Sequence, residues 1–268
     1  MDLQDQYLEV LKKSLLSWSD IGTSYWIPKR KGFPGFVNRN LTRFGFKKYQ
    51  WCSSKMITLE SKLDGRERHP SGLTMIGLKR LNHLHVCIRD VIQQNIPGDF
   101  IETGVWRGGT TIFMKATLKA FGDTSRNVWV ADSFEGLPVP DSSNPKEIQK
   151  DIDPEKILAV PLHEVKNNFK SYSLLDERVK FLPGWFKDTL PDAPIEKLSI
   201  MRLDGDFYES TMDALEHLYP KLSSGGYVII DDYSLMSCRN AVHEFREKYN
   251  ITEPIKSIDW TGVFWKKV

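Results

Sequence analysis

The amino-acid sequence predicts an α/β protein with a doubly wound, mostly parallel sheet. Short, almost entirely apolar runs alternate with segments of helical periodicity from Ser71 to the C-terminus. Parallel neighbours need crossover connections, and the helices in these crossovers cover both faces of the sheet, so the buried strands appear as continuous apolar runs. The last two runs, 255–258 and 263–265, are expected to form an antiparallel edge at the C-terminal end of the sheet.

The expected elements follow one another in a regular order. Apolar residues at helical spacing within 3–15 predict an amphipathic first helix, with Asp2 or Asp5 as its cap. Short apolar runs that end at turn residues predict the strands 99–103, 128–131, 179–182, 198–203 and 227–230. Helical periodicity predicts helices over 75–86, 110–121, 162–172, 211–222 and 240–249.

Composition and charge exclude several classes of protein. The 268 residues carry a formal net charge of +2, which gives the molecule no general attraction to nucleic acid or anionic lipid. Three widely spaced cysteines argue against a disulfide framework or a structural zinc site and favour a reducing compartment. No apolar run approaches the roughly 18 residues of a membrane span, and the N-terminus lacks the apolar core of a signal peptide. We therefore expect a soluble cytoplasmic protein that binds neither nucleic acid nor membranes.

Residues 21–59 differ in composition from the rest of the chain. They contain no Asp or Glu, but they carry eight Lys and Arg among eight aromatic residues. One interpretation is a solvated lid whose aromatic side chains pack on the core. Alternatively, the basic side chains meet an acidic acceptor, a carrier-bound intermediate or a neighbouring subunit. Interleaved basic and aromatic residues also occur in nucleic-acid-binding proteins, but this chain has no recognised binding module and little net charge.

A glycine turn follows the first predicted strand of the sheet. The sequence Glu102-Thr-Gly-Val-Trp-Arg-Gly-Gly109 places glycine where backbone must approach a ligand closely. Trp106 and Arg107 fill the turn where a dinucleotide fingerprint has glycine, which disfavours a pyrophosphate on the following helix. S-adenosylmethionine has no phosphate and fits such a turn. Asp132, at the end of the next strand, is placed to accept hydrogen bonds from both ribose hydroxyls, although an ordinary structural corner capped by this Asp also explains the pattern.

Four aspartates follow two other predicted strands. Arg202-Leu-Asp-Gly-Asp206 contributes Asp204 and Asp206, and Ile230-Asp-Asp-Tyr233 contributes Asp231 and Asp232. The carboxyl ends of these strands meet at the ligand-binding edge of the sheet, where clustered negative charges require a cation or protons. Carboxylate oxygens are hard ligands that suit Mg²⁺, Ca²⁺ or Mn²⁺. We predict that Asp204, Asp231 and Asp232 hold a divalent metal; the alternative is that the aspartates cap the helices that follow.

The acidic cluster also suggests how a hydroxyl group would be activated. An alcohol is a poor nucleophile until it begins to lose its proton; a metal lowers its pKa, and a nearby carboxylate can take the proton. We assign the role of base to Asp206. His243, downstream of the diacid, is the nearest rival, but a single histidine in an amphipathic helix is more often a surface or packing residue.

At these residues the sequence resembles the macrocin O-methyltransferase family, whose members methylate deoxysugar hydroxyls on macrolides and on aminocoumarin precursors. The resemblance covers nearly all of 71–268. It rests on the motifs Thr74-Met-Ile-Gly77, Ile101 to Gly109, Ala131-Asp-Ser-Phe-Glu-Gly-Leu-Pro138, Leu182-Pro-Gly-Trp-Phe-Lys-Asp-Thr-Leu190, Leu203-Asp-Gly-Asp-Phe-Tyr-Glu-Ser210, Gly225-Gly-Tyr-Val-Ile-Ile-Asp-Asp-Tyr233 and Ile258-Asp-Trp-Thr-Gly262.

The resemblance implies a class I methyltransferase fold in 71–268, S-adenosylmethionine and Mg²⁺ or another hard divalent cation as cofactors, and a homo-oligomer. It assigns the metal to Asp204, Asp231 and Asp232 and supports Asp206 as the base. The cofactor residues that it implies are Thr74, Met75, Glu102, Gly104, Asp132, Ser133 and Trp185. Residues 1–70, an N-terminal helix and a lid over the acceptor, depart from the family in 21–59, so acceptor specificity does not carry over.

The expected function is therefore S-adenosylmethionine- and metal-dependent O-methylation of a small-molecule hydroxyl, on a sugar, in natural-product and antibiotic biosynthesis. The same chemistry on a phenol or catechol is the nearest alternative, and only the acceptor-facing segment distinguishes the two. A metal-dependent hydrolase would use the same carboxylates but has no need of a nucleoside pocket. A non-catalytic nucleoside-binding subunit would bind the cofactor without turnover.

Overall fold

The structure is a computed structural model that describes residues 2–28, 32–43, 52–66, 70–138 and 158–268. Parts of the basic and aromatic segment 21–59, namely 29–31 and 44–51, therefore lie outside the described residues. Within the described ranges, no helix is long and apolar enough to cross a membrane.

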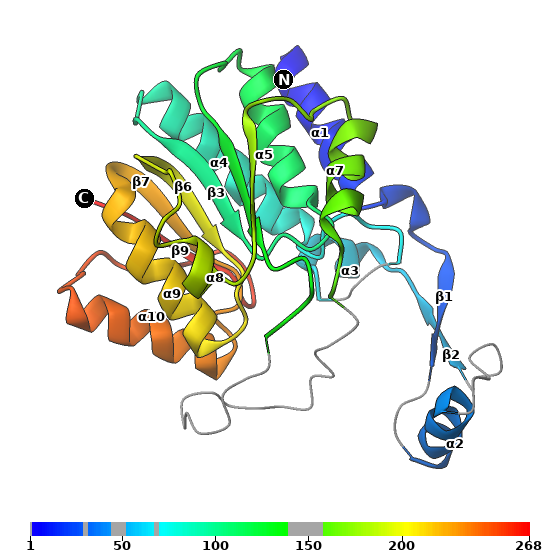
Figure 1. Ribbon diagram of the computed structural model, residues 1–268. Coiled ribbons are helices and arrows are strands. Elements are labelled where there is room, and N and C mark those ends of the chain that lie inside the picture. Colours follow the sequence, from blue (N-terminus) through cyan, green and yellow to red (C-terminus); the bar gives the residue numbers. More distant parts are fainter. Residues whose placement is uncertain (1, 29–31, 44–51, 67–69, 139–157) are drawn as a thin grey trace.

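A seven-stranded sheet forms the centre of the described structure (Figure 1), with the strand order β5-β4-β3-β6-β7-β9-β8. Strands β3 to β7 are parallel, and β9 runs antiparallel to β7 and β8. The bounds are β3 (Asp99–Thr103), β4 (Val128–Asp132), β5 (Val179–Pro183), β6 (Leu198–Leu203), β7 (Leu222–Ile230), β8 (Lys256–Ser257) and β9 (Val263–Lys266). The predicted doubly wound, mostly parallel sheet with an antiparallel C-terminal edge is confirmed.

Helices cover both faces of this sheet (Figure 1). One face carries α1 (Leu3–Leu15), α4 (Leu78–Gln93), α5 (Gly109–Ala120) and α7 (Leu162–Ser171); the other carries α8 (Phe186–Thr189), α9 (Tyr208–Leu218) and α10 (Met236–Lys248). Successive strand residues alternate between the two cores: Phe100 packs with the first set of helices and Ile101 with the second. The fully buried Leu8 and Leu15 of α1 belong to the first core, so α1 is part of the body.

The helix predicted over 75–86 begins later than expected. Gly77 is its N-cap, and the preceding residues cross the start of α5 as irregular chain with several bends. There the backbone N–H of Gly109 donates to the carbonyl of Leu73 (3.0 Å), and the Thr74 hydroxyl lies 3.0 Å from that of Thr110. These contacts leave Met75 outside the helix, and they bring it to the edge of the sheet.

Other element ends also differ from the prediction. Helix α9 begins at Tyr208 and α10 at Met236, each a few residues before its predicted start. Strand β7 begins at Leu222, because a 3-10 turn over Tyr219–Lys221 closes α9 and feeds directly into the strand. Val86, predicted on the buried face of α4, is 55% exposed.

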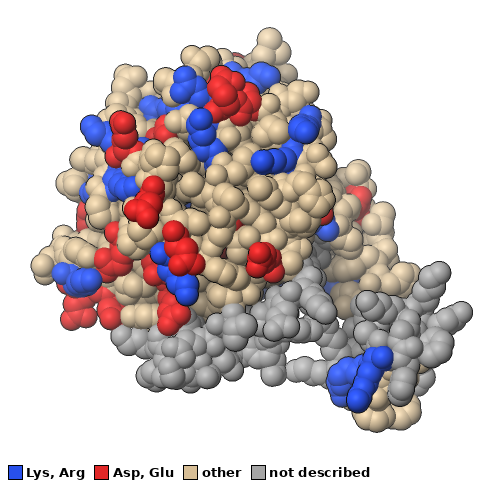
Figure 2. All heavy atoms as spheres, in the orientation of Figure 1, with Lys and Arg blue, Asp and Glu red and all other residues tan. Residues whose placement is uncertain are grey.

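Two further strands form an arm that projects from the body (Figure 1). β1 (Ser24–Pro28) pairs antiparallel with β2 (Cys52–Met56), and α2 (Gly32–Arg43) lies at the far end of this ribbon. α3 (Leu59–Asp64) connects the ribbon to the body. Trp26, Phe33 and Phe36 are 73%, 68% and 57% exposed, so the expectation that the aromatic residues pack on the core is wrong for these three. Figure 2 shows Lys and Arg side chains over α2, whereas charges of both signs mix over the body.

Candidate active site

A cavity of about 360 Å³ opens at the carboxyl edge of the sheet. Strand β3 has β4 on one side and β6 on the other, so the strand order reverses there, and ligands bind at such a reversal in open α/β sheets. All seven predicted cofactor residues line this cavity: Thr74, Met75, Glu102, Gly104, Asp132, Ser133 and Trp185. Asp204 and Asp206 line it as well. The cavity therefore brings the glycine turn and part of the acidic cluster into one site.

Gly104 allows the turn after β3 to approach the turn after β6. Its φ of +80° lies in the left-handed region, and a Cβ added to it would lie 1.8 Å from the carbonyl oxygen of Asp204. No side chain fits at that distance. Glycine at this position therefore sets the spacing between the cofactor turn and the acidic cluster.

Asp132 holds the glycine turn through backbone amides. Its Oδ2 accepts from the N–H groups of Val105 (2.7 Å) and Trp106 (3.3 Å), and its Oδ1 accepts from that of Phe134 (2.7 Å). Trp106 and Phe134 both have positive φ values, 49° and 58°, which are costly for bulky residues and cluster at functional sites. Burial raises the pKa of Asp132, although these three amides oppose the rise. These amides occupy three of the roughly four acceptor sites of the carboxylate, which leaves one for a ligand. The predicted hydrogen bonds from both ribose hydroxyls stay a prediction.

Glu102 is a buried carboxylate with one oxygen paired and one oxygen free of partners. Glu102 lies in register with Arg202 on the neighbouring strand β6, and its Oε1 forms an ion pair with that guanidinium. Its Oε2 is buried and has no hydrogen-bond partner among the described residues. Burial raises the pKa of Glu102 to about 8, against the opposing effect of Arg202. Because an unpaired buried acceptor is unfavourable, this oxygen fits a ligand that donates a hydrogen bond into the cavity.

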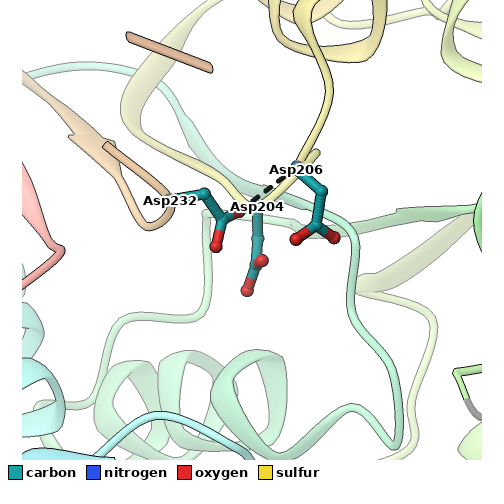
Figure 3. Close-up of side chains that lie close together, drawn as sticks. All are labelled: Asp204, Asp206 and Asp232. Atoms are coloured by element: carbon teal, nitrogen blue, oxygen red, sulfur yellow. Dashed lines mark hydrogen bonds between the residues drawn. The ribbon is translucent and has the colours of Figure 1, made fainter. Parts of the chain in front are cut away.

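Three aspartates converge beside the cavity (Figure 3). One carboxylate oxygen from each of Asp204, Asp206 and Asp232 lies within 4.8 Å of the other two. The backbone N–H of Asp206 donates to Oδ2 of Asp232 (3.2 Å). This donor set consists of hard oxygen ligands from two neighbouring strand ends, which suits a divalent cation.

Burial and mutual repulsion raise the pKa values in this cluster, and Arg202 opposes the rise only in part at Asp204. Burial, followed by the neighbouring carboxylates, raises the pKa of Asp204 to about 6 and that of Asp206 to about 7. The same causes raise the pKa of Asp232 well above its ordinary value. Each carboxylate therefore holds its proton more tightly than in water, and a cation would favour the release of these protons.

Asp231 has different neighbours. Its Oδ1 pairs with Arg202 and its Oδ2 with Arg80, and all three side chains are buried. Burial would raise the pKa of Asp231, but the two guanidinium groups outweigh it and lower the pKa. Asp231 thus lies behind the group of three, and its predicted role as a metal ligand stays a prediction.

The alternative that these aspartates cap helices is wrong. The N-cap of α9 is Phe207 and that of α10 is Leu235, and neither helix has a side-chain cap bond. Asp206 moreover has a φ of 56°, a strained value for a residue other than glycine. His243, the weaker candidate base, hydrogen-bonds through Nε2 to the Tyr233 hydroxyl (2.8 Å) and does not line the cavity.

Two arginines at the site were not predicted from the sequence. Arg202 lies near the end of β6, two residues before Asp204, and pairs with it (3.0 Å); an arginine within a largely apolar strand was a usable signal. Arg80 lies in the first turn of α4, where no pattern in the sequence connects it with Asp231. Lys187, Glu209 and Asp213, which also line the cavity, carried no signal either.

A doubly wound sheet, a glycine turn leading into α5, an acid at the end of β4 and an acidic cluster at the ends of β6 and β7 together define a class I methyltransferase that takes its methyl group from S-adenosylmethionine. The model of the macrocin O-methyltransferase family matches residues 4–267, and the chain belongs to this family. It is an O-methyltransferase.

Relatives of known activity and structure resemble the chain over most of its length. The 8-demethyl-8-(2,3-dimethoxy-alpha-L-rhamnosyl)-tetracenomycin-C 4'-O-methyltransferase of Streptomyces olivaceus is 55% identical over 209 residues, covering 77% of this chain and 80% of that protein. The mycinamicin III 3''-O-methyltransferase of Micromonospora griseorubida is 47% identical and covers 78% and 84%. The solved structure of the O-methyltransferase NovP superimposes with a TM-score of 0.83 at 40% identity, covering 99% of both chains.

Proposed function

We propose that this enzyme transfers the methyl group of S-adenosylmethionine to a sugar hydroxyl of a glycosylated natural product in antibiotic biosynthesis. The observation that carries the proposal is that the cofactor turn and two aspartates of the acidic cluster, Asp204 and Asp206, line the same cavity. The choice of a sugar is supported by the relative named for methylation of a rhamnosyl tetracenomycin, which is 55% identical to this chain.

For the cofactor, we propose that the seven cavity-lining residues predicted from the sequence bind S-adenosylmethionine, which supplies the methyl group. The partnerless Oε2 of Glu102 suits a donor on this ligand, such as a hydroxyl or the amino group. Trp185, at the N-cap of α8, offers an aromatic ring beside the cavity, as expected for a residue near adenine. Thr74 and Met75 border the cavity from the segment that crosses the start of α5.

For the metal, we propose that Asp204 and Asp232 hold a divalent cation such as Mg²⁺. A bound cation supplies a lowered pKa for the hydroxyl that it polarises. Asp206 lies close enough to complete this group of carboxylates, whereas both oxygens of Asp231 pair with arginines. The sequence-based assignment of Asp231 as the third ligand is tested by comparing the Mg²⁺ affinities of the D206N and D231N variants.

We propose that Asp206 is the base that accepts the proton of the acceptor hydroxyl. Its side chain lines the cavity, and burial beside other carboxylates raises its pKa, which makes it a stronger base than an aspartate in water. Arg202 lies behind the cluster and pairs with Asp204 (3.0 Å), so it offsets part of the negative charge that deprotonation restores.

The test is turnover with labelled S-adenosylmethionine and a panel of glycosylated and phenolic acceptors, in Mg²⁺ or with chelator. The proposal expects methylation of a glycosylated acceptor that stops on chelation and resumes when Mg²⁺ is restored. Transfer that survives thorough chelation contradicts the metal. Exclusive methylation of the phenolic acceptors supports the catechol alternative, and cofactor binding without any transfer supports a non-catalytic subunit.

Three further assignments accompany this function. We propose a domain boundary after residue 70. The arm and α3 precede this boundary, although α1 packs in the same core as α5.

We also propose self-association, because exposed aromatic side chains such as Trp26 and Phe33 are typical of protein interfaces. Light scattering of the purified protein tests this proposal. We also propose a cytoplasmic location, which is supported by the finding that Cys52, Cys87 and Cys238 form no disulfide with one another in the described residues.

A further inference from the structure

Arg80 joins three segments of the chain that are far apart in sequence. Its guanidinium is buried, with the side chain 6% exposed. Nη1 donates to Oδ2 of Asp231, Nη2 donates to the carbonyl of Gly65 (3.2 Å), and Nε lies 3.0 Å from Oδ2 of Asp259. One side chain therefore contacts the end of α3, the loop before β9 and the diacid after β7.

The contact with Asp231 leads on to the acidic cluster and the cofactor cavity. Asp231 shares its other oxygen with Arg202, and the same guanidinium binds Asp204 (3.0 Å) and Glu102. The two arginines thus clamp Asp231 from both sides. Because Asp232 is the next residue, this clamp fixes the backbone that presents Asp232 to Asp204 and Asp206.

The contacts on the other side of Arg80 hold the base of the arm, residues 58–66. Trp260 Nε1 donates to the carbonyl of Asp64 (2.9 Å), and the guanidinium of Arg66 stacks 4.9 Å from the Trp260 ring centre. Asp259 in turn shapes this loop by accepting from the N–H groups of Thr261 (3.0 Å) and Gly262 (2.8 Å).

The space around Arg80 leaves little freedom. A Cβ on Gly65 would lie 2.8 Å from Arg80 Nη2, and one on Gly262 would lie 3.1 Å from its Cδ. Lysine has a single donor site at the end of its chain, whereas the planar guanidinium donates from separate N–H groups to Asp231 and Gly65. It also holds its charge 3.0 Å from Oδ2 of Asp259, an ion pair without a hydrogen bond. The pocket is therefore built for arginine.

We propose that Arg80 is a positioning residue that holds the acidic cluster in its cation-binding arrangement and links it to the base of the arm. The inference rests on the proposed metal site. It has two consequences: loss of the guanidinium fork weakens cation binding without touching the cofactor, and cation binding orders residues 58–66 only when Arg80 is present. The second consequence follows because Arg80 contacts both Asp231 and Gly65, so that order at either end favours order at the other.

The test compares Arg80→Lys with the wild-type enzyme in two measurements. Mn²⁺ titration, read from the spectrum of the free ion in electron paramagnetic resonance, gives cation affinity, and calorimetry with S-adenosylhomocysteine gives cofactor affinity. Outer-shell partners of metal ligands contribute roughly 10- to 100-fold in affinity, so R80K should bind Mn²⁺ at least tenfold more weakly, with cofactor affinity within about twofold. In hydrogen exchange, Mn²⁺ should slow residues 58–66 in the wild type and not in R80K.

Arg126→Lys is the matched control. Arg126 is also largely buried and bound to several partners, Asp123, Ile96, Gly98 and Ser199, but these surround the opposite end of the sheet. R126K should lose stability without losing Mn²⁺ affinity. If R80K folds and binds Mn²⁺ as tightly as R126K does, Arg80 is only structural and the inference is wrong.

Two outcomes separate this inference from the proposed function. Wild-type enzyme that binds no Mn²⁺ contradicts the metal site itself, whereas wild-type binding with unchanged R80K contradicts only the role of Arg80. If R80K does not fold, the Asp259→Asn variant tests the role of Arg80 instead, because it leaves Arg80 and Asp231 in place. The proposal expects Mn²⁺ to slow exchange at 58–66 less in D259N than in the wild type, and equal slowing overturns it.

Discussion

Glu102 and Arg202 lie in register on β3 and β6, and their side chains form an ion pair beneath the cavity. Both side chains are about 2% exposed. The same guanidinium serves Asp204 and Asp231, so a single buried positive charge connects the cofactor turn with the acidic cluster. The negative charge of the site is therefore neutralised in part by Arg202, a residue of β6, and not by loop residues alone.

Glu102→Gln should weaken cofactor binding. The amide keeps the shape but replaces one acceptor with a donor, and a buried polar group left without its partner costs roughly 1–3 kcal/mol, which corresponds to a loss of about fivefold or more in affinity. Calorimetry with S-adenosylhomocysteine measures it. Glu135→Gln is the control, since Glu135 is exposed and does not line the cavity. Equal affinities of the two variants would show that Glu102 is not a ligand of the cofactor.

Asp206→Asn should stop turnover and leave cofactor binding intact. Removal of a general base costs about 10²- to 10⁴-fold in rate. Asparagine tolerates the left-handed backbone at this position better than most residues, so the fold should persist. Single-turnover rates with labelled cofactor measure the loss. Asp213→Asn, another acid of the same cavity, is the control; a D206N rate near that of D213N argues against the base.

The metal-free enzyme should lose stability as the pH rises from about 4 to about 7. The folded-state pKa values of Asp204 (about 6) and Asp206 (about 7) lie above the unfolded value of 3.8, so the folded protein binds more protons than the unfolded chain in this window. The two aspartates therefore stabilise the fold fully below pH 3.8, their pKa in the unfolded chain. This stabilisation is lost as the pH rises past their pKa values in the folded protein, about 6 and about 7.

Thermal unfolding in chelator, followed from about pH 5 to about pH 8, measures this loss, which should be shallower in D206N. Addition of Mg²⁺ should raise the melting temperature more at the higher pH, because the ion replaces the released protons. A melting temperature in chelator that rises equally with pH in both proteins would contradict the assignment.

Gly104→Ala should damage both stability and cofactor binding. The variant Cβ meets the Asp204 carbonyl in addition to the strain of a positive φ. Gly122→Ala separates the two effects, since Gly122 has a φ of +71° and nothing within 4 Å of an added Cβ. Strain alone costs about 1–2 kcal/mol, so denaturant unfolding should show a larger loss in G104A than in G122A, and only G104A should lose cofactor affinity.

The regular part of the fold is predictable from sequence because its signals are local. Each strand of the parallel sheet contains a short apolar stretch that ends near turn residues, and the structure confirms all five strands, as well as the antiparallel edge. The element ends were less predictable. The start of α4 depends on the contacts of Leu73 and Thr74 with α5, which are tertiary and leave no mark in the periodicity.

The site was predictable where function follows from position along a strand. The glycine turn and the aspartates come directly after strands, so topology brings them to one edge. The different roles of the aspartates were not predictable, because they depend on how the side chains of Arg80 and Arg202 are oriented. Asp231 and Asp232 are adjacent in sequence, yet their surroundings differ. The arginines lower the pKa of Asp231, whereas burial and neighbouring carboxylates raise the pKa of Asp232.

The position of β9 has a consequence for aggregation. This strand lies between β7 and β8, pairs antiparallel with β7, and buries Trp265 to 1% exposure. Without β9 the edge of β7 would be open, and uncovered edges pair with other chains. We therefore expect a substitution that detaches β9, such as Trp265→Asp, to cause aggregation rather than a small loss of activity.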